Sequence, residues 1–312
     1  MSRGRADRPG GTGADPGGIP AARSTKLIVR EELGPAPPAG APSRSTRLIV
    51  GDEPGAEPDR IAARRSARPR LRLDADGRVV HDIRPAELTN DLAGWIADDL
   101  VAPGHLDPAA FEDTFVAVVQ DVDPGWTVFY RNTLAALATA GAHGGTNAGM
   151  APVHDRAAAL AVGPHVVELG CCFGFLSLRL AADGHRVTAV DLVPGTARLL
   201  AHVSEKLGTP VTTLAGNALA VPLQDASADT VFAVHLLEHL PRSLDAAVLT
   251  EMLRVARQRV VVAVPFEDEP APAWGHVRTF DLDDLHALGA ATGLPYAVDE
   301  HHGGWLTVEK RT

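Results

Sequence analysis

Cysteine and long apolar segments are scarce in this chain of 312 residues. Its 2 cysteines, Cys171 and Cys172, are adjacent, and neighbouring residues rarely reach disulfide geometry, so a disulfide framework is excluded. No apolar run approaches the ~18 residues that a membrane span needs, and the first residues hold no apolar segment of a secretory signal. We therefore expect a reduced, cytoplasmic protein without a membrane span.

Positive charge is also in short supply, because 29 Lys and Arg face 39 Asp and Glu, a net charge of −10. Residues 1–70 differ, with 13 basic and 8 acidic residues, 10 Pro and 10 Gly. Such a segment cannot bury enough apolar surface to offset the entropy of ordering it, so we expect a disordered, solvated arm. The remainder carries −15, which opposes phosphate binding and makes nucleic acid an unexpected partner.

A short repeat lies in this arm. Residues 24–29 (STKLIV) recur almost unchanged as residues 45–50 (STRLIV). Each copy is a β-prone apolar run that could add to an exposed sheet edge of a partner, or it is a duplication within a linker. The sequence leaves the role of the repeat open.

Residues 71–150 predict a small helical cap subdomain. Apolar and polar residues alternate on both sides of Asp76-Gly77, which favours a hairpin. Helical spacing follows from Pro85, from Asp107-Pro108 and from Trp126 to Ala140. The glycine-rich residues 141–149 are expected to form a loop or hinge.

Residues 151–312 predict an α/β domain, because apolar β runs alternate with helical segments. We expect strands at residues 166–169, 186–190, 211–214, 230–234, 260–264, 296–300 and within 305–308. Most should be parallel, with helices on both faces. Ligands bind such sheets at the carboxyl ends of the strands.

The clearest motif begins where the first of these strands ends. Glu168 precedes a loop in which Gly170 and Gly174 permit close backbone approach, and Asp191 ends the next strand, 23 residues after Glu168. A carboxylate there can accept hydrogen bonds from a ribose. A nicotinamide site would need G-x-G-x-x-G to meet a pyrophosphate, whereas this loop reads E-x-G-x-x-x-G. An acidic loop suits the cationic, phosphate-free S-adenosylmethionine (SAM).

The chain resembles the class I SAM-dependent methyltransferases in four sequence segments: VVELGCCFGFLSLRLA, VTAVDL, AGNALAVPLQDASADTVFAVHLLEHLP and RVVVAVPFEDEP. The resemblance implies a Rossmann-like, seven-stranded, mostly parallel sheet with an antiparallel last strand. It implies that SAM contacts Glu168, Gly170, Cys171, Phe173, Gly174, Asp191, Leu192, Asn217, Ala218 and His235. Two positions depart from the family pattern: Cys172 replaces a glycine and Asn217 replaces a common aspartate.

Further sequence segments resemble one particular methyltransferase family. WTVFYRNTL, GCCFGFL, HLLEHL, VAVPFEDEP, GHVRTFDL and EHHGGWL are similar to the mycofactocin oligosaccharide methyltransferases, over about residues 85–312. That family O-methylates a glucose of the oligosaccharide on a peptide-derived redox cofactor. The resemblance therefore implies a sugar hydroxyl as acceptor.

A sugar hydroxyl is a poor nucleophile and needs a base or a metal ion. We predict His239 as the base, with Glu238 or a nearby acid orienting its ring, and His276 as the second candidate. Together with His235 these residues also resemble the magnesium site of small-RNA terminal 2′-O-methyltransferases. Mg²⁺ prefers oxygen ligands, so magnesium is the less favoured interpretation, and the metal requirement stays open.

The sequence is also compatible with two other functions. The chain could methylate a quinone, a polyketide or another small molecule, which would call for an apolar acceptor pocket. It could also be a non-catalytic SAM-binding scaffold, although the presence of Gly170, Gly174 and Asp191 argues against loss of function. The sequence does not predict the oligomeric state.

Overall fold

The computed structural model describes residues 45–47, 68–139 and 145–310. Most of the expected disordered arm, residues 1–70, lies outside this part of the chain, as does the first copy of the repeat. The second copy contributes strand β1 (Ser45–Arg47), which pairs in parallel with β3 (Val79–His81). These three residues differ from the expectation of disorder, because they add to the edge of the hairpin that follows them.

A seven-stranded sheet forms the centre of the molecule, in the order β6-β5-β4-β7-β8-β10-β9. The first five of these strands are parallel, whereas β10 runs antiparallel to both its neighbours. The strands are β4 (His165–Leu169), β5 (Arg186–Asp191), β6 (Thr212–Ala215), β7 (Ala228–Val234), β8 (Ala256–Val264), β9 (Tyr296–Glu300) and β10 (Gly304–Glu309). The predicted Rossmann-like sheet with an antiparallel last strand is thus confirmed.

Helices cover both faces of the sheet because successive strand residues point to opposite sides. Val166, Phe232 and Ala263 share a core with helices on one face, whereas Val167, Val231 and Val262 share a core with helices on the other. The first face carries α5 (Thr146–Leu160), α6 (Phe175–Ala182) and α7 (Pro194–Leu207), and the second carries α8 (Asp245–Val255) and α9 (Leu282–Ala291).

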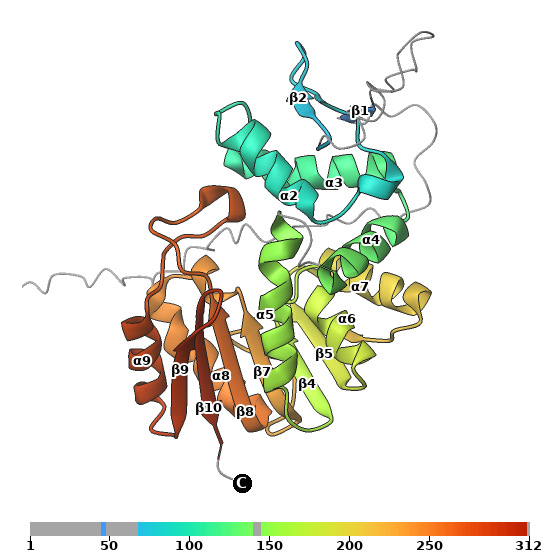
Figure 1. The fold of residues 1–312 in the computed structure, drawn as a ribbon. Helices are drawn as coiled ribbons and strands as arrows, with labels where there is room; N and C mark the ends of the chain where they lie inside the picture. The colour runs from blue at the N-terminus through green and yellow to red at the C-terminus, as the bar shows by residue number, and fades with distance from the viewer. Residues whose placement is uncertain (1–44, 48–67, 140–144, 311–312) are drawn as a thin grey trace, which may run out of the picture.

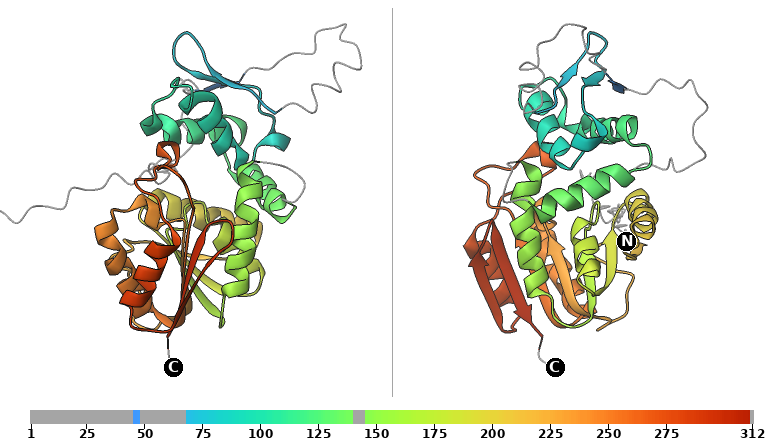
Figure 2. Two further views of the ribbon diagram at one scale, coloured as in Figure 1. Left: turned by 60° about the vertical axis from the view of Figure 1, so that its left-hand side comes forward. Right: turned by 45° about the vertical axis from the view of Figure 1, so that its right-hand side comes forward.

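Residues 68–138, which the sequence predicts to form a helical cap, lie above one end of the sheet (Figures 1 and 2). This region contains the hairpin β2 (Leu71–Leu73) and β3, then the helical segments η1 (Pro85–Glu87), α2 (Asp91–Ile96), η2 (Ala97–Val101), η3 (Pro108–Ala110), α3 (Phe111–Val122) and α4 (Thr127–Ala138). Its buried residues form one continuous core with the α5–α7 face of the sheet. Phe111 also packs edge-on against Trp274, with ring centroids 5.6 Å apart, so the cap reaches the loop that follows β8.

The glycine-rich stretch is only partly the expected loop. Residues 140–144 lie outside the described ranges, but helix α5 already begins at Thr146 and continues through Gly149 to Leu160. The expected division at residue 150 therefore falls inside one helix. Tertiary packing overrides the low helix propensity of glycine here, since Asn147, Val153 and Ala157 of α5 are buried. No helix in the described ranges is both long and apolar enough to cross a membrane.

Candidate functional site

The loop after β4 is held against the end of β5. Gly170 N–H donates to the Val190 carbonyl at 2.7 Å, and Cys172 N–H donates to Asp191 Oδ2 at 2.9 Å. Gly170 and Gly174 both have a φ of 71°, a conformation that glycine adopts without steric cost. A Cβ at Gly174 would lie 2.3 Å from Leu200 Cδ2, so this helix start also needs glycine for close packing.

Cys172, which stands where the family pattern has a glycine, adopts a backbone conformation typical of glycine. Its φ is 51°, in the left-handed region that few residues other than glycine occupy readily. The hydrogen bond from its N–H to Asp191 helps to hold this backbone conformation. The loop therefore keeps a glycine-like path despite the added side chain.

Two buried carboxylates flank this loop. Asp191, 1% exposed, also accepts from Val193 N–H through Oδ1 at 3.0 Å. Each carboxylate oxygen has a second lone pair, so the same group can accept from a ribose hydroxyl. Glu168 is 4% exposed and accepts a hydrogen bond from the Ser177 hydroxyl. Both side chains are fixed by these contacts in the folded chain, before any ligand arrives.

The remaining predicted cofactor residues line the neighbouring strand ends. Leu192 directly follows Asp191 and is 50% exposed, so its apolar side chain is accessible to an adenine ring. Asn217 Oδ1 accepts from Leu219 N–H at 2.9 Å, which leaves its Nδ2 group as the donor for a ligand. Gly216 N–H donates to the Asp191 carbonyl at 2.8 Å and ties this loop to β5.

Tyr130 is a residue at this site that the sequence analysis did not single out. Its ring, from α4, packs 5.2 Å from Phe175 and 6.2 Å from Phe173. Its hydroxyl is buried and has no hydrogen-bond partner in the described part of the chain. Burial, followed by the nearby Cys172 and Cys171, raises the pKa of Tyr130 well above its usual value, so it stays a neutral donor. An orphaned donor beside this loop fits a ligand that brings a hydrogen-bond acceptor, such as the carboxylate of SAM.

His235 follows β7, the strand next to β4. Its N–H donates to the Ala263 carbonyl at 2.9 Å, and its φ of 50° places it in the left-handed region. Burial, then His276 and His154, lowers the pKa of His235 to about 4. The ring is therefore a neutral hydrogen-bonding group at neutral pH.

The three predicted catalytic residues meet although they come from two loops. Glu238 and His239 lie in the turn after β7, and His276 lies in the loop after β8; their ligand-type atoms all lie within 4.8 Å of one another. The two imidazole rings have centroids 5.0 Å apart. His276 Nδ1 lies 2.7 Å from Glu267 Oε2, and His239 Nδ1 lies 3.2 Å from the Gly275 carbonyl oxygen. We call Glu238, His239 and His276 the Glu–His–His cluster.

Arg278 joins the two loops of this cluster. Its guanidinium donates to the Leu240 carbonyl at 2.8 Å and to the Leu237 carbonyl at 3.1 Å, and it pairs with Asp245. It also stacks 4.0 Å from the centroid of the Phe280 ring. Because Val277 N–H donates to the Glu238 carbonyl at 2.9 Å, backbone and side-chain bonds hold the loops in register.

Arg278→Met is expected to lower the free energy of unfolding by about 3 kcal/mol, because it leaves Asp245 as a buried charge without its cation. The Arg278 and Asp245 side chains are only 12% and 6% exposed. Urea unfolding measures the loss. Arg242→Met, which removes an exposed partner of Asp284, serves as the control and should change stability by less than about 1 kcal/mol. Equal losses in both variants would contradict the role given to Arg278.

His154, which the sequence analysis passed over, is a second buried histidine near the site. It is 7% exposed on α5, and burial, followed by the charge of Arg179, lowers its pKa to about 4, with Asp155 opposing. Below about pH 6.5, His154 is therefore protonated in the unfolded chain but stays neutral in the folded chain.

The free energy of unfolding should fall as the pH drops from about 6.5 toward 4, by about 1.4 kcal/mol per unit for this group. Urea unfolding at pH 7 and pH 5 measures it. The loss between these two values should be about 2 kcal/mol smaller in His154→Gln than in the unaltered chain. The same pH dependence in both proteins would show that His154 ionises freely in the fold.

Further aromatic and histidine side chains near these loops take other places in the fold. Trp305 is 1% exposed in the core, where Nε1 donates to the His301 carbonyl, so it does not stack on a ligand. Trp274 packs on Phe111 of the cap. His301 and His302 are exposed on the turn between β9 and β10, outside the Glu–His–His cluster.

Residues 167–264 match the family model described as "Methyltransferase domain". No curated protein matches the chain. Among solved structures, a SAM-dependent methyltransferase from Aquifex aeolicus is 20% identical over 49% of this chain and 85% of its own, with a TM-score of 0.40. The magnesium protoporphyrin IX methyltransferase of Synechocystis PCC 6803, solved with SAH, is 15% identical over 63% of this chain and 100% of its own, with a TM-score of 0.44.

The family match runs from β4 to the end of β8 and so contains the loop glycines, Asp191 and the turn after β7. Its span coincides with the strand ends at which a parallel sheet of this type binds ligands. Residues 167–264 thus match a methyltransferase domain, and they lie in a seven-stranded, mostly parallel sheet.

Proposed function

We propose that the chain methylates a hydroxyl group of a sugar, a glucose in the oligosaccharide of mycofactocin. The observation that carries this proposal is the polar character of the Glu–His–His cluster, which follows β7 directly beside the cofactor strand β4. A hydroxyl acceptor must lose its proton for the transfer, and imidazole and carboxylate groups promote that loss. The narrower sequence resemblance supports glucose as the acceptor.

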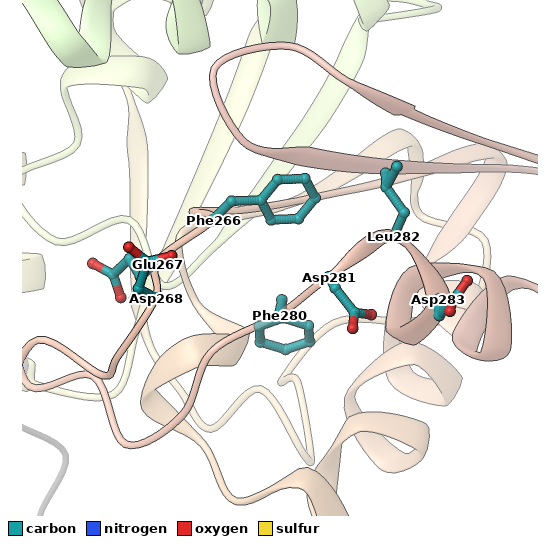
Figure 3. Close-up of a pocket in the computed structure, with 7 residues that line it drawn as sticks. All are labelled: Phe266, Glu267, Asp268, Phe280, Asp281, Leu282 and Asp283. Atoms are coloured by element: carbon teal, nitrogen blue, oxygen red, sulfur yellow. The ribbon is translucent and has the colours of Figure 1, made fainter.

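A pocket of about 570 Å³ lies next to this cluster, because its lining residue Glu267 contacts His276. Figure 3 shows the rings of Phe266 and Phe280 between the acidic pair Glu267 and Asp268 and the two acids at the start of α9. Carboxylates accept hydrogen bonds from hydroxyls, and aromatic rings pack on the apolar faces of a sugar. The lining of this pocket therefore favours a polyhydroxylated acceptor.

The described side chains fit a quinone or polyketide acceptor less well than a sugar. A quinone or polyketide would call for an apolar acceptor pocket, yet the aromatic residues of the cap pack on one another. Phe115, Phe129 and Phe173 are each at most 5% exposed and form a cluster with centroid distances of 5.3–5.7 Å. They build the core that joins cap and sheet, which leaves the polar side for the acceptor.

In the proposed reaction SAM supplies an electrophilic methyl group on its sulfonium. Asp191 and the glycine loop would hold SAM at the ends of β4 and β5, and the Glu–His–His cluster would activate the acceptor hydroxyl after β7. Holding the methyl group and the acceptor oxygen in line is the main contribution to the rate, because it converts a bimolecular step into an effectively unimolecular one. A reducing, cytoplasmic setting fits Cys171 and Cys172, which form no disulfide.

The test is a mass spectrum of mycofactocin species from cells with and without this gene, followed by reaction of the purified chain with SAM and the unmethylated glycan. We expect the glycan to lose one methyl increment in the deletion strain and to regain it in the purified reaction. The His276→Ala variant should bind SAM but leave the glycan unmethylated. An unchanged glycan profile would overturn the sugar proposal and direct the search to quinone and polyketide acceptors.

A further inference from the structure

The Glu–His–His cluster has the composition of a metal site. Two imidazoles and one carboxylate offer ligand atoms within 4.8 Å of one another, so small rotations of the side chains would bring all three onto a single ion. Glu238 is 1% exposed, and Glu267 lies directly behind His276, so two carboxylates favour a cation here. We propose that this cluster binds one divalent transition-metal ion, which holds and acidifies the acceptor hydroxyl.

The contacts behind the two rings support this assignment. His239 Nδ1 faces the Gly275 carbonyl oxygen and His276 Nδ1 faces the Glu267 carboxylate, at 3.2 and 2.7 Å. Both partners are hydrogen-bond acceptors, so each neutral ring carries its proton on Nδ1 and its lone pair on Nε2. Metal-binding histidines in proteins are oriented in this same way, by a carbonyl or a carboxylate on the second nitrogen.

The backbone around the cluster is fixed before an ion arrives. Val277 N–H bonds the Glu238 carbonyl, and Arg278 bonds the carbonyls of Leu237 and Leu240 on either side of the Glu238–His239 pair. The turn with two ligands and the loop with the third are thus locked to each other. A metal site needs such support, because small shifts of a ligand loop weaken coordination.

The ligand types select the class of ion. Imidazole nitrogen suits Zn²⁺, Fe²⁺, Co²⁺ and Ni²⁺, whereas Mg²⁺ demands oxygen ligands in an octahedral arrangement. Three protein ligands leave at least one position open for a further oxygen, as in catalytic zinc sites. The geometry therefore favours a transition ion over magnesium and leaves room for the acceptor.

The role of the ion rests on the proposed function, whereas its binding does not. A hydroxyl bound to such an ion ionises much more readily than in water, as metal-bound water does when its pKa falls to about 7. The proton passes to solvent, the electron pair of the O–H bond stays on the oxygen, and no oxidant or reductant is needed. In this assignment His239 and His276 act through the ion and not as bases.

The test uses the untagged full chain, stripped with a chelator and titrated with Co²⁺, whose visible absorption reports the ligand set. We expect about one Co²⁺ per chain, displaced by Zn²⁺ but not by millimolar Mg²⁺. Glu238→Gln and His276→Ala should abolish the signal, and Glu267→Gln should weaken binding about 10–100-fold. His301→Ala is the matched control, since His301 and His302 form an exposed pair with centroids 4.9 Å apart, and it should bind as the unaltered chain does.

Equal Co²⁺ binding by the unaltered chain and His276→Ala would overturn the site, as would no binding at all. Circular dichroism of Glu238→Gln, a change of nearly the same shape, separates loss of ligand from loss of fold. Methylation of the glycan that persists after chelation would reject the ion and keep the proposed function. Stoichiometric metal binding with no sugar methylation would keep the site and reject the sugar.

Discussion

Replacing Asp191 by alanine is expected to raise the Kd for SAM about 100-fold, as measured by isothermal titration calorimetry. The carboxylate accepts from Cys172 N–H and Val193 N–H, and it has lone pairs left for a ribose. A hydrogen bond to a charged group contributes ~1.5–3 kcal/mol, and each ~1.4 kcal/mol is tenfold in affinity. Losing the predicted ribose contacts and the loop anchor together should therefore weaken SAM binding by about two orders of magnitude.

Two further variants sharpen this prediction. Asp191→Asn keeps one acceptor oxygen and should fall in between, with a loss of about tenfold. Asp183→Ala, which removes an exposed partner of Arg179 at the end of α6, should leave the Kd unchanged. If folded Asp191→Ala bound SAM within threefold of the unaltered chain, the ribose assignment would be wrong.

The sheet was predictable because its signal is local. A strand buried on both faces needs a continuous apolar run, and the runs at 166–169, 230–234 and 260–264 each became the buried part of a strand. The loop glycines and Asp191 were predictable for the same reason, since their spacing follows from one strand, one turn and one helix. The extra residues of β8, from Ala256 to Arg259, include three polar side chains and gave no such signal.

The joining of distant segments was beyond the sequence. Glu238 and His276 lie close together because Arg278 bonds to the turn after β7. These hydrogen bonds could not be predicted from the spacing of 38 residues between Glu238 and His276. The buried positions of Tyr130 and His154 depend in the same way on how the cap and α5 pack on the sheet face that also carries α6 and α7. Helix α5 also begins inside a glycine-rich stretch, where local propensity favours a loop.

Removing either histidine of the Glu–His–His cluster should lower kcat by about 10²–10⁴-fold, because the acceptor hydroxyl is then no longer activated. The Kd for SAM should stay within about twofold, since the loop that Asp191 holds follows β4, whereas the two rings follow β7 and β8. Steady-state kinetics with the methyl acceptor and calorimetry with SAM measure the two effects separately. A fall in SAM affinity of the same size as the fall in kcat would place these histidines in the cofactor site.

The double variant decides how the two rings act. If His239 and His276 hold one ion, the loss of either empties the site, and His239→Ala/His276→Ala should be no slower than the worse single variant. If one ring removed the proton and the other only bound the acceptor, the two losses would multiply. Strong non-additivity in kcat, with an unchanged Kd for SAM, would therefore identify the cluster as a single catalytic unit.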